Sequence, residues 1–448
     1  MSLTLSSLRR CFEGAVPAVI STCDQNGVVN VAYLSQVHYM DEEHVALSFQ
    51  FFNTTRRNIL VNPRATILLV DPITAEHYLL HIAYLKTVSD GPLFETMKAR
   101  LAGIASHSGM SEVFRLKGSD IYRVERIESL SHTSAPIASP PPPRVLQALR
   151  RTTASLARCH DLSELIDQAL ECLAQEFDMP HAMLLMLDAT GMKLYTVASR
   201  GYHQSGVGSE IGLGEGIIGV AAREKVPIRI GHCATEYLYG RAVRESYLQR
   251  HAGIDIEMSI PVPGLARSGS QIAVPVVLGD RLIGVLYAES PQEMRFSWDD
   301  EDAMVALCDY LALAISSMEQ CSEATTEPVV NTQSLAVGAD KLVTVCFYRA
   351  DQSIFIDNEY LIKGVAGAIL WKLLRDYSAL GRDEFSNREL RHDVSLRLPD
   401  VVDNLEARLI LLQRRLTERS KVLTIEKTGR GRFRLRVCGT LTLSEELG

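Results

Sequence analysis

A short polar stretch near residue 55 has the residue types that bind phosphate. Thr54 and Thr55 supply hydroxyl groups, and Arg56 and Arg57 follow them directly. Hydroxyls donate hydrogen bonds to phosphate oxygens, and a guanidinium group can bind the same anion through two parallel N–H donors. The pattern therefore predicts an anion site of phosphate size. The alternative is a polar surface turn in which a threonine caps a following helix.

The stretch lies between predicted strands of an antiparallel sheet or barrel. Short apolar runs alternate with turn signals, and Asn26-Gly27 is typical of a tight hairpin turn. After Gly91 and Pro92, apolar residues recur at helical spacing from Leu93 to Ile104, which predicts an amphipathic helix. The expected strands cover residues 16–22, 28–34, 44–49, 65–70 and 77–85.

Residues 1–128 resemble the FMN-binding split barrels of the pyridoxamine-phosphate-oxidase-like family. The resemblance is carried by Gly14-Ala-Val-Pro-Ala18, Leu34-Ser-Gln-Val-His38, Asn53-Thr-Thr-Arg-Arg-Asn58, Asn62-Pro-Arg-Ala-Thr66 and Gly91-Pro-Leu-Phe94. In that family the polar turn holds the flavin phosphate, and two barrels pair about a twofold axis. The resemblance therefore implies FMN as the cofactor and a homodimer. It assigns FMN binding to Ser35, Gln36, Gln50, Thr54, Thr55, Arg56 and Arg57.

The resemblance leaves the chemistry of the barrel open. Its family includes oxidases, flavin reductases, haem-binding relatives and members without known activity, and the motifs assign no catalytic residue. Haem is the alternative cofactor, with His38, His77 and His81 as the iron ligands to consider. A single histidine in a strand is more often a core or surface residue, so we expect FMN rather than haem.

The second segment alternates helical and strand patterns. Apolar spacing predicts one helix over residues 145–175, followed by strands at 182–187 and 194–199. A hairpin is expected over 270–290, with its turn at Gly279-Asp280. Ser297 is a fitting N-cap for the last helix, because acidic residues follow it and favour the positive end of the helix dipole.

Glycines at positions 212, 214, 216 and 219 have a spacing close to that of a dinucleotide-binding loop. We reject that interpretation because no βαβ pattern precedes the run and no acidic residue follows at the expected strand end. The segment resembles a GAF domain over residues 145–318 instead. The matching motifs are Gly214-Glu-Gly-Ile-Ile-Gly-Val-Ala221, Val285-Leu-Tyr-Ala-Glu-Ser290 and Phe296-Ser-Trp-Asp-Asp-Glu-Asp302.

The GAF resemblance implies a small-molecule pocket whose ligand the sequence does not identify. The variable segment 232–258 is expected to cover it and to supply the pocket residues His232, Cys233, Tyr237, Tyr239 and His251. Two alternatives remain open, a metal or redox site at His232 and Cys233, and a dimer scaffold that binds no ligand. We expect no metal.

The third segment is basic on an otherwise acidic chain. Residues 361–436 carry 17 Lys and Arg against 10 Asp and Glu, a net charge of +7, so the rest of the chain carries −15 within the overall −8. Such a basic appendage is typical of nucleic-acid binding, with a solvated basic surface as the alternative. Its pattern predicts a strand pair at 341–357, helices at 364–377, from 386 and at 400–419, and a hairpin at 422–436.

This order resembles the winged-helix effector domain of two-component response regulators over residues 341–437. Arg414-Arg-Leu416 and Thr428-Gly-Arg-Gly-Arg-Phe-Arg-Leu435 carry the likeness. It implies that the 400–419 helix enters the major groove and that the hairpin, or wing, contacts the DNA backbone. The implied DNA-binding residues are Arg408, Arg414, Arg415, Arg419, Lys427, Arg430 and Arg432. The helix also carries the apolar run Leu409-Ile-Leu-Leu412, so protein contacts by the wing are the alternative.

The whole chain is therefore predicted to be a multi-domain α+β protein of 448 residues, with a split β-barrel, a GAF α/β/α sandwich and a winged helix. The expected divisions are barrel 1–130, Pro-rich linker 131–144, GAF domain 145–320, linker 321–337 and winged helix 338–440. Nine cysteines never form Cys-x-x-Cys, which together with the absence of a signal-peptide pattern or an apolar membrane span favours the reducing cytoplasm. We expect a transcriptional regulator that senses flavin or a GAF ligand, with DNA as partner. An FMN-dependent oxidoreductase of the reductase or oxidase type, regulated by its GAF domain, is the alternative.

Overall fold

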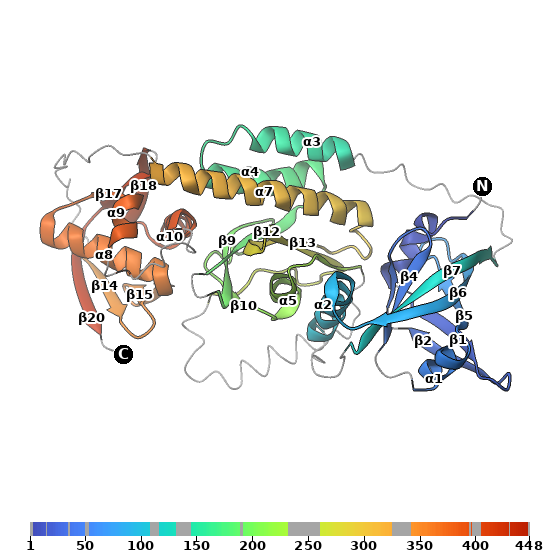
Figure 1. The fold of residues 1–448 in the computed structure, drawn as a ribbon. Helices are drawn as coiled ribbons and strands as arrows, with labels where there is room; N and C mark the ends of the chain where they lie inside the picture. The colour runs from blue at the N-terminus through green and yellow to red at the C-terminus, as the bar shows by residue number, and fades with distance from the viewer. Residues whose placement is uncertain are drawn as a thin grey trace.

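The fold is known from a computed structural model of the chain. The structure describes residues 3–14, 16–34, 36–49, 53–107, 116–130, 145–188, 191–231, 260–324, 342–393, 396, 405–429 and 431–446. Three groups of strands follow one another along the chain, each with its own helices (Figure 1). Among the described residues, no helix is long and apolar enough to cross a membrane.

The first group is a seven-stranded antiparallel sheet in the order β2-β1-β5-β6-β7-β4-β3. Every second residue of β1 and β5 is buried, as expected when one face of a strand packs on a core. The predicted strands and the hairpin at Gly27 are confirmed, whereas β3 and β7 were not predicted. The strands are β1 (Ala18–Cys23), β2 (Val29–Leu34), β3 (Val37–Tyr39), β4 (His44–Phe49), β5 (Arg64–Val70), β6 (His77–Val88) and β7 (Gly118–Ser129).

Two short helices accompany this sheet. The 3-10 helix η1 (Ser6–Glu13) buries Leu8 and Phe12 in the barrel core. Helix α1 (Asn53–Val61) begins within the predicted phosphate-binding stretch and ends just before β5. The sheet therefore places this stretch at the start of a helix, next to β1 and β2.

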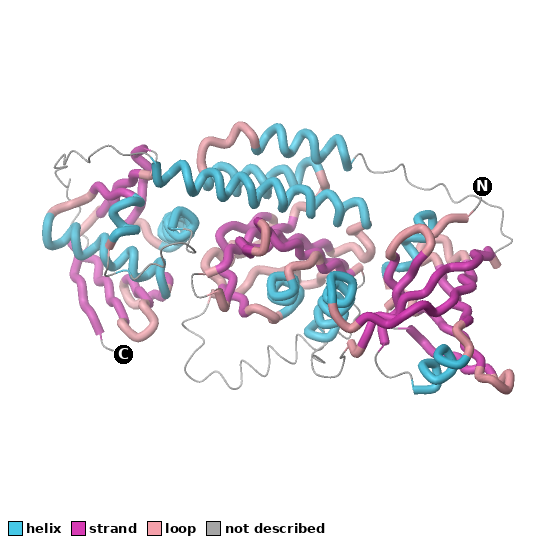
Figure 2. Tube along the Cα trace, viewed as in Figure 1, coloured by secondary structure: helices cyan, strands magenta, loops and turns pink. Residues whose placement is uncertain are grey.

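The second group is a six-stranded antiparallel sheet between helical layers (Figure 2). Helices α3 (Val145–Leu156), α4 (Leu162–Glu176) and α7 (Trp298–Ala324) cover one face, and α5 (Gly216–Glu224) covers the other. The strand order is β10-β9-β8-β13-β12-β11. The strands are β8 (His181–Leu187), β9 (Lys193–Arg200), β10 (Glu210–Gly212), β11 (Ile228–Ile230), β12 (Ser270–Leu278) and β13 (Arg281–Ser290).

The single helix predicted over residues 145–175 is wrong, because the structure has two. Helix α3 ends at Leu156 and α4 begins at Leu162. Asp161 caps α4, and its side chain accepts a hydrogen bond of 2.9 Å from the backbone N of Glu164. The carboxylate of a capping residue satisfies a donor that a continuous helix would use internally, which explains why the chain starts a new helix here.

Helix α2 (Gly91–His107) confirms the helix predicted after Gly91, but it does not complete the barrel. It packs against α5 and β11 on the second face of the GAF-like sheet, where Ala99 is buried in the same apolar cluster as α5. Lys98 on α2 forms an ion pair of 3.6 Å with Glu224 at the end of α5. The first segment of the chain therefore contributes a helix to the second.

The third group has a four-stranded sheet, three helices and a three-stranded sheet. The first sheet has the order β16-β15-β14-β20, and its pairing of β14 with β20 is parallel. The second has the order β17-β19-β18 and contains the predicted hairpin. The elements are β14 (Leu342–Tyr348), β15 (Ser353–Ile356), β16 (Glu359–Ile362), α8 (Gly364–Leu380), β17 (Glu384–Ser386), α9 (Asn387–His392), α10 (Leu405–Arg419), β18 (Leu423–Gly429), β19 (Arg432–Val437) and β20 (Thr440–Glu446).

The second and third groups share one continuous apolar cluster. It runs from the inner faces of α4 and α7 to α8 and α10. Helix α7 extends along the GAF-like sheet towards the third group and touches α9 there (Figure 1). The third group therefore packs directly against the second through apolar side chains.

Candidate functional site

The predicted phosphate-binding stretch is folded into the first turn of α1. Thr55 is buried, and its Oγ1 accepts a hydrogen bond of 2.9 Å from Asn30 Nδ2 on β2. Thr54 and Arg57 are exposed, and Arg57 Nη2 lies 3.3 Å from Thr54 Oγ1. Asn58 Nδ2 donates a hydrogen bond of 3.2 Å to Thr22 Oγ1 on β1, which fixes the turn to the sheet. The structure thus brings Thr54 and Arg57 together at the surface and ties Thr55 to the sheet.

Arg56 points the other way, into the barrel. Its Nη1 donates a hydrogen bond of 2.6 Å to the buried carboxylate of Asp120 on β7, and its guanidinium lies over the rings of Phe49 and Tyr84. Burial opposes the charge of Arg56, but the neighbouring carboxylate outweighs it and raises the pKa of Arg56. On the more deeply buried Asp120, burial prevails and raises the pKa of the carboxyl. The guanidinium of Arg56 is therefore already paired with an anion inside the barrel, the carboxylate of Asp120.

The other barrel residues assigned to flavin or haem divide between described and undescribed positions. Ser35 and Gln50 lie outside the described residues. The side-chain oxygen of Gln36 is buried and has no hydrogen-bond partner among the described residues, so it can accept from a bound group. His38 packs edge-on against Trp298, and His81 lies 3.2 Å from Arg126 Nη2. Within the described ranges, no cluster of three or more His, Cys, Asp or Glu side chains could hold a metal ion.

The GAF-like sheet has a cavity of about 260 Å³ beside β10 and α5. The residues predicted to line the pocket, His232, Cys233, Tyr237, Tyr239 and His251, lie outside the described residues. The described wall combines an apolar side from α5 with polar groups from β12 and β13. Its residues are Ile211, Glu215, Gly216, Ile217, Ile218, Val262, Pro263, Gly264, Gln271, Tyr287 and Glu289.

Two buried polar residues of this cavity were missed from the sequence. Glu289 is 2% exposed, and one of its oxygens accepts a hydrogen bond of 2.9 Å from the backbone N of Leu265. Gln271 is 3% exposed and donates to Ser268, while its side-chain oxygen has no partner among the described residues. Both lie one residue from the end of a strand whose middle is apolar, so the sequence pattern gave little sign that they would be buried. The cavity therefore presents acceptor oxygens to a ligand that carries N–H or O–H donors.

The glycine run that resembles a nucleotide loop has a packing role. Gly214 N donates to Gly219 O, and a side chain on Gly219 would meet the carbonyl oxygen of Gly212 at 2.2 Å. Glu215 closes the turn by accepting from the backbone N of Gly212 at 3.0 Å. The glycines let β10 and α5 approach each other, which agrees with the rejection of a dinucleotide site.

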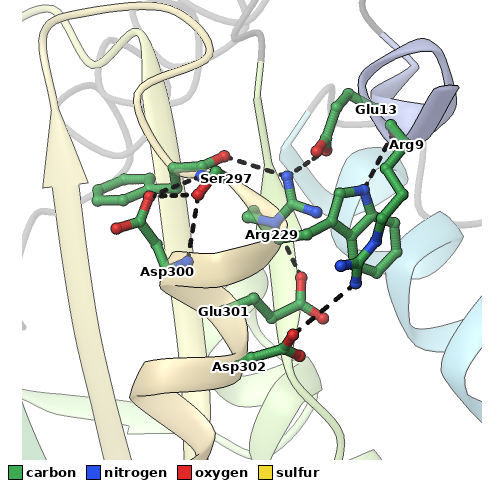
Figure 3. A network of polar contacts seen from close by, with 9 residues as sticks. Arg9, Glu13, Arg229, Ser297, Asp300, Glu301 and Asp302 are labelled. Atoms are coloured by element: carbon green, nitrogen blue, oxygen red, sulfur yellow. Dashed lines mark hydrogen bonds and ion pairs between the residues drawn. The ribbon is translucent and has the colours of Figure 1, made fainter. Parts of the chain in front are cut away.

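A buried arginine joins the barrel to the GAF-like sheet (Figure 3). Arg229 on β11 bonds to Glu13 of η1, and its Nε donates to Glu301 of α7 at 2.8 Å. Its Nη1 also reaches the carbonyl of Phe296 at 3.1 Å, and its guanidinium lies 4.7 Å from the centre of the Trp298 ring. Burial would lower the pKa of Arg229, but the two carboxylates raise it.

The same junction is reinforced at its edge by Arg9. The indole N–H of Trp298 donates to the carbonyl of Arg9 at 3.2 Å, and the Arg9 guanidinium lies 4.9 Å from the centre of the Trp298 ring. Arg9 also reaches Asp302 at 3.8 Å. Sequence reasoning identified the Ser297–Asp302 motif as a helix start but gave no sign that it would contact the barrel.

The predicted DNA-binding residues are mostly held by protein contacts. Arg408 lies over the Tyr195 ring at 3.8 Å, Arg414 bonds to Asp167 at 2.7 Å, and Arg415 Nε donates to the carbonyl of Leu361 at 2.9 Å. Burial lowers the pKa of Arg415. Arg419 is exposed and Arg432 is half-buried. Lys427 pairs with Asp161 at 2.9 Å, and Arg430 lies outside the described residues.

Two family models match parts of the chain. Residues 6–125 match the model described as pyridoxamine 5'-phosphate oxidase, and residues 159–316 match the GAF domain. The chain thus contains a pyridoxamine-phosphate-oxidase-like segment with a curled antiparallel sheet, followed by a GAF segment. No curated protein matches the chain.

Solved structures resemble the two matched segments at low identity. An FMN-binding protein from Syntrophomonas wolfei is 16% identical and aligns over 28% of this chain and 86% of its own, with a TM-score of 0.25. The GAF domain of an Acinetobacter phosphoenolpyruvate-protein phosphotransferase is 20% identical over 39% of this chain and 94% of its own, with a TM-score of 0.30. A free methionine-R-sulfoxide reductase from Neisseria meningitidis, solved with its substrate, is 18% identical over 40% and 91%, with a TM-score of 0.30.

Proposed function

We propose that the protein is a cytoplasmic ligand-sensing regulator in which the barrel and the GAF domain control a DNA-binding winged helix. The observation that carries this proposal is the third group, where three helices and a hairpin occur in winged-helix order in the basic part of the chain. The sensing role rests on the matched family segments and on the GAF cavity, where the side-chain oxygen of Gln271 has no partner among the described residues. Domain limits near residues 130, 145, 320 and 338 belong to the same proposal.

Arg419, which is exposed, and Arg432, which is half-buried, are expected to contribute phosphate contacts. The double variant Arg419→Ala, Arg432→Ala should weaken binding of random duplex DNA at low salt, because each phosphate contact releases counterions. The slope of log affinity against log salt concentration should shrink by about two for two lost contacts. Fluorescence anisotropy of a labelled duplex over a salt series measures both quantities.

The matched control is Arg158→Ala, Arg267→Ala, which removes the same charge from exposed positions of the GAF segment. Its salt slope should equal that of the unmodified protein. If the unmodified protein binds no duplex at low salt, the proposed DNA-binding role is wrong. If the two variants have equal salt slopes, α10 and the wing do not contact the DNA phosphates.

For the barrel we propose FMN as the cofactor and a homodimer as the assembly. The residues fit the phosphate in part, since Thr54 and Arg57 are exposed at the start of α1 whereas Arg56 is bound to Asp120. The phosphate would then be held by Thr54, Arg57 and the N–H groups at the start of α1. Gln36 offers an acceptor to the ring system, and FMN would supply redox chemistry at that place.

Arg57→Ala is expected to weaken FMN binding without unfolding the barrel. Loss of one charge-assisted contact to a phosphate should raise the Kd about 10-fold or more. Titration of the apoprotein with FMN, followed by quenching of flavin fluorescence, measures the Kd. Arg64→Ala on β5, another exposed arginine of the barrel, is the control and should leave the Kd unchanged.

An FMN-dependent oxidoreductase remains the second candidate function, favoured by the match to the pyridoxamine 5'-phosphate oxidase model. Absorption spectra decide between the two. Rapid bleaching of bound flavin by NADH or NADPH, with turnover in air, would support the enzyme. A Soret band would indicate haem, and a colourless protein that takes up no flavin would leave the barrel as a dimerisation scaffold.

A further inference from the structure

Helix α10 is buried on more sides than a surface helix should be. Six consecutive residues, 407–412, are all buried, including Arg408. A surface helix buries one face against its own domain and exposes the opposite face to solvent. A helix that reads DNA must keep this exposed face free for the major groove. The apolar run that departs from a DNA-reading helix is therefore explained by a second partner.

That partner is the GAF segment. One side of α10 packs against α8, β16 and β18 of its own group, and another side packs against β9 and α4 (Figure 1). On the GAF side, Arg408 stacks on Tyr195 at 3.8 Å. Leu411 lies beside Gly208, and its Cδ1 would be 3.9 Å from a Cβ added there. Arg414 Nη1 donates to the carbonyl of Val197 at 3.2 Å.

Acidic residues of the GAF segment meet basic residues of the third group around this apolar contact. Arg414 pairs with Asp167 at 2.7 Å, Lys427 with Asp161 at 2.9 Å, and Lys363 with Glu210 at 3.4 Å. Burial opposes ionisation of Asp161, but the hydrogen bond and charge of Lys427 together with backbone N–H groups at the start of α4 outweigh it and lower the pKa of that carboxyl. At Arg414 and Lys427, carboxylates thus occupy the place that the proposed function gives to DNA.

We infer that the GAF segment is an autoinhibitory surface: it covers the face of the third group that would bind duplex DNA, so that docking and DNA binding exclude each other. This inference rests on the proposed DNA-binding function. In the docked arrangement Arg408, Arg414 and Lys427 are all engaged, and a duplex can reach α10 only after the two groups separate.

The docking surface is continuous with the wall of the GAF cavity. Glu210 on β10 contacts Lys363, and the next residue, Ile211, lines the cavity. Glu210 is also the strand partner of Tyr195, and the Tyr195 ring contacts the guanidinium of Arg408. A cavity ligand that binds the separated and docked arrangements with different affinity therefore shifts the fraction of molecules that can bind DNA. The size of the shift is set by the ratio of the two affinities.

The test compares two full-length variants of equal charge. Asp161→Asn with Asp167→Asn removes two docking ion pairs and keeps an N-cap at position 161. Asp178→Asn with Asp280→Asn removes the same charge from exposed sites of the GAF segment away from α10. Each protein is titrated with one labelled duplex by anisotropy at fixed low salt, and hydrogen exchange of the α10 amides reports docking without DNA.

The docking variant is expected to bind the duplex about 3- to 10-fold more tightly than the unmodified protein, the range set by two partly exposed ion pairs. Its α10 amides should exchange faster, and the control should match the unmodified protein in both measurements. If the docking variant exchanges faster yet binds DNA no more tightly than the control, the inference is wrong and DNA binding stands. If no protein of the series binds the duplex, the proposed function fails, and the inference with it.

Discussion

Arg229→Ala is expected to destabilise the protein by about 3–5 kcal/mol, because removing one member of a buried ion pair takes the neutralising cation away from buried carboxylates. Here two carboxylates, Glu13 and Glu301, lose the same arginine, and both side chains are 7% exposed. The loss should lower the thermal transition of the barrel and GAF segments by roughly 10 °C, for domains of this size. Differential scanning calorimetry of the full chain measures it, since several domains need not unfold in one step.

The position of Arg229 makes a second outcome specific. Glu13 belongs to the barrel and Glu301 to α7, so the variant should also separate the unfolding of the two segments into distinct transitions. Arg200→Ala, which removes an exposed arginine paired with Glu171, is the control and should change stability by less than about 1 kcal/mol. Adding Glu13→Gln and Glu301→Gln to Arg229→Met should recover part of the loss, because the two carboxylates are then replaced by neutral amides. An unchanged calorimetric trace for Arg229→Ala would show that this junction does not hold the two segments together.

Arg56→Ala is expected to destabilise the barrel by about 3 kcal/mol, at the low end for a buried pair because Arg56 is 23% exposed. Asp120 would keep its hydrogen bond from Thr87 but lose the neighbouring cation that favours its charged form. The free energy of unfolding, measured from the barrel transition in urea, gives the size of the effect. Arg57→Ala serves as the control, since this exposed neighbour should leave stability within about 0.5 kcal/mol.

The stability lost in Arg56→Ala should depend on pH in a direction that follows from the pKa of Asp120. The pKa of Asp120 is raised by burial, and loss of Arg56 raises it further. A carboxyl whose folded pKa lies above its unfolded value of about 3.9 favours the folded state below that value, and the advantage is lost as the pH rises through the folded pKa. The deficit of Arg56→Ala relative to the unmodified protein should therefore be small near pH 4 and larger at neutral pH. A deficit that is constant over this range would indicate that Arg56 acts by packing on Phe49 and Tyr84 alone.

Helix α10 shows how an accurate local prediction can miss the tertiary arrangement. Its spacing of apolar residues predicts a helix, and the helix is present over its described part. The unusual run Leu409–Leu412 indicated a conflict with a DNA-reading face, and packing of α10 against β9 and α4 in addition to its own group accounts for it. The same holds for Arg56 and Arg57, which are adjacent in sequence but point to a buried carboxylate and to solvent respectively.

The sequence by itself determined most of the barrel and GAF strands, several helix starts and two of the turns, because alternation, capping residues and Asn-Gly or Gly-Asp turns act over a few neighbouring residues. It also determined the basic character of the third group. Only the tertiary structure decided that α2 packs on the GAF segment, that Arg229 joins β11 to Glu13 and Glu301, and that Asp161 and Asp167 face Lys427 and Arg414. The ion pairs among these contacts join residues 72 to 266 positions apart, and local patterning cannot specify them because they depend on how whole sheets and helices pack.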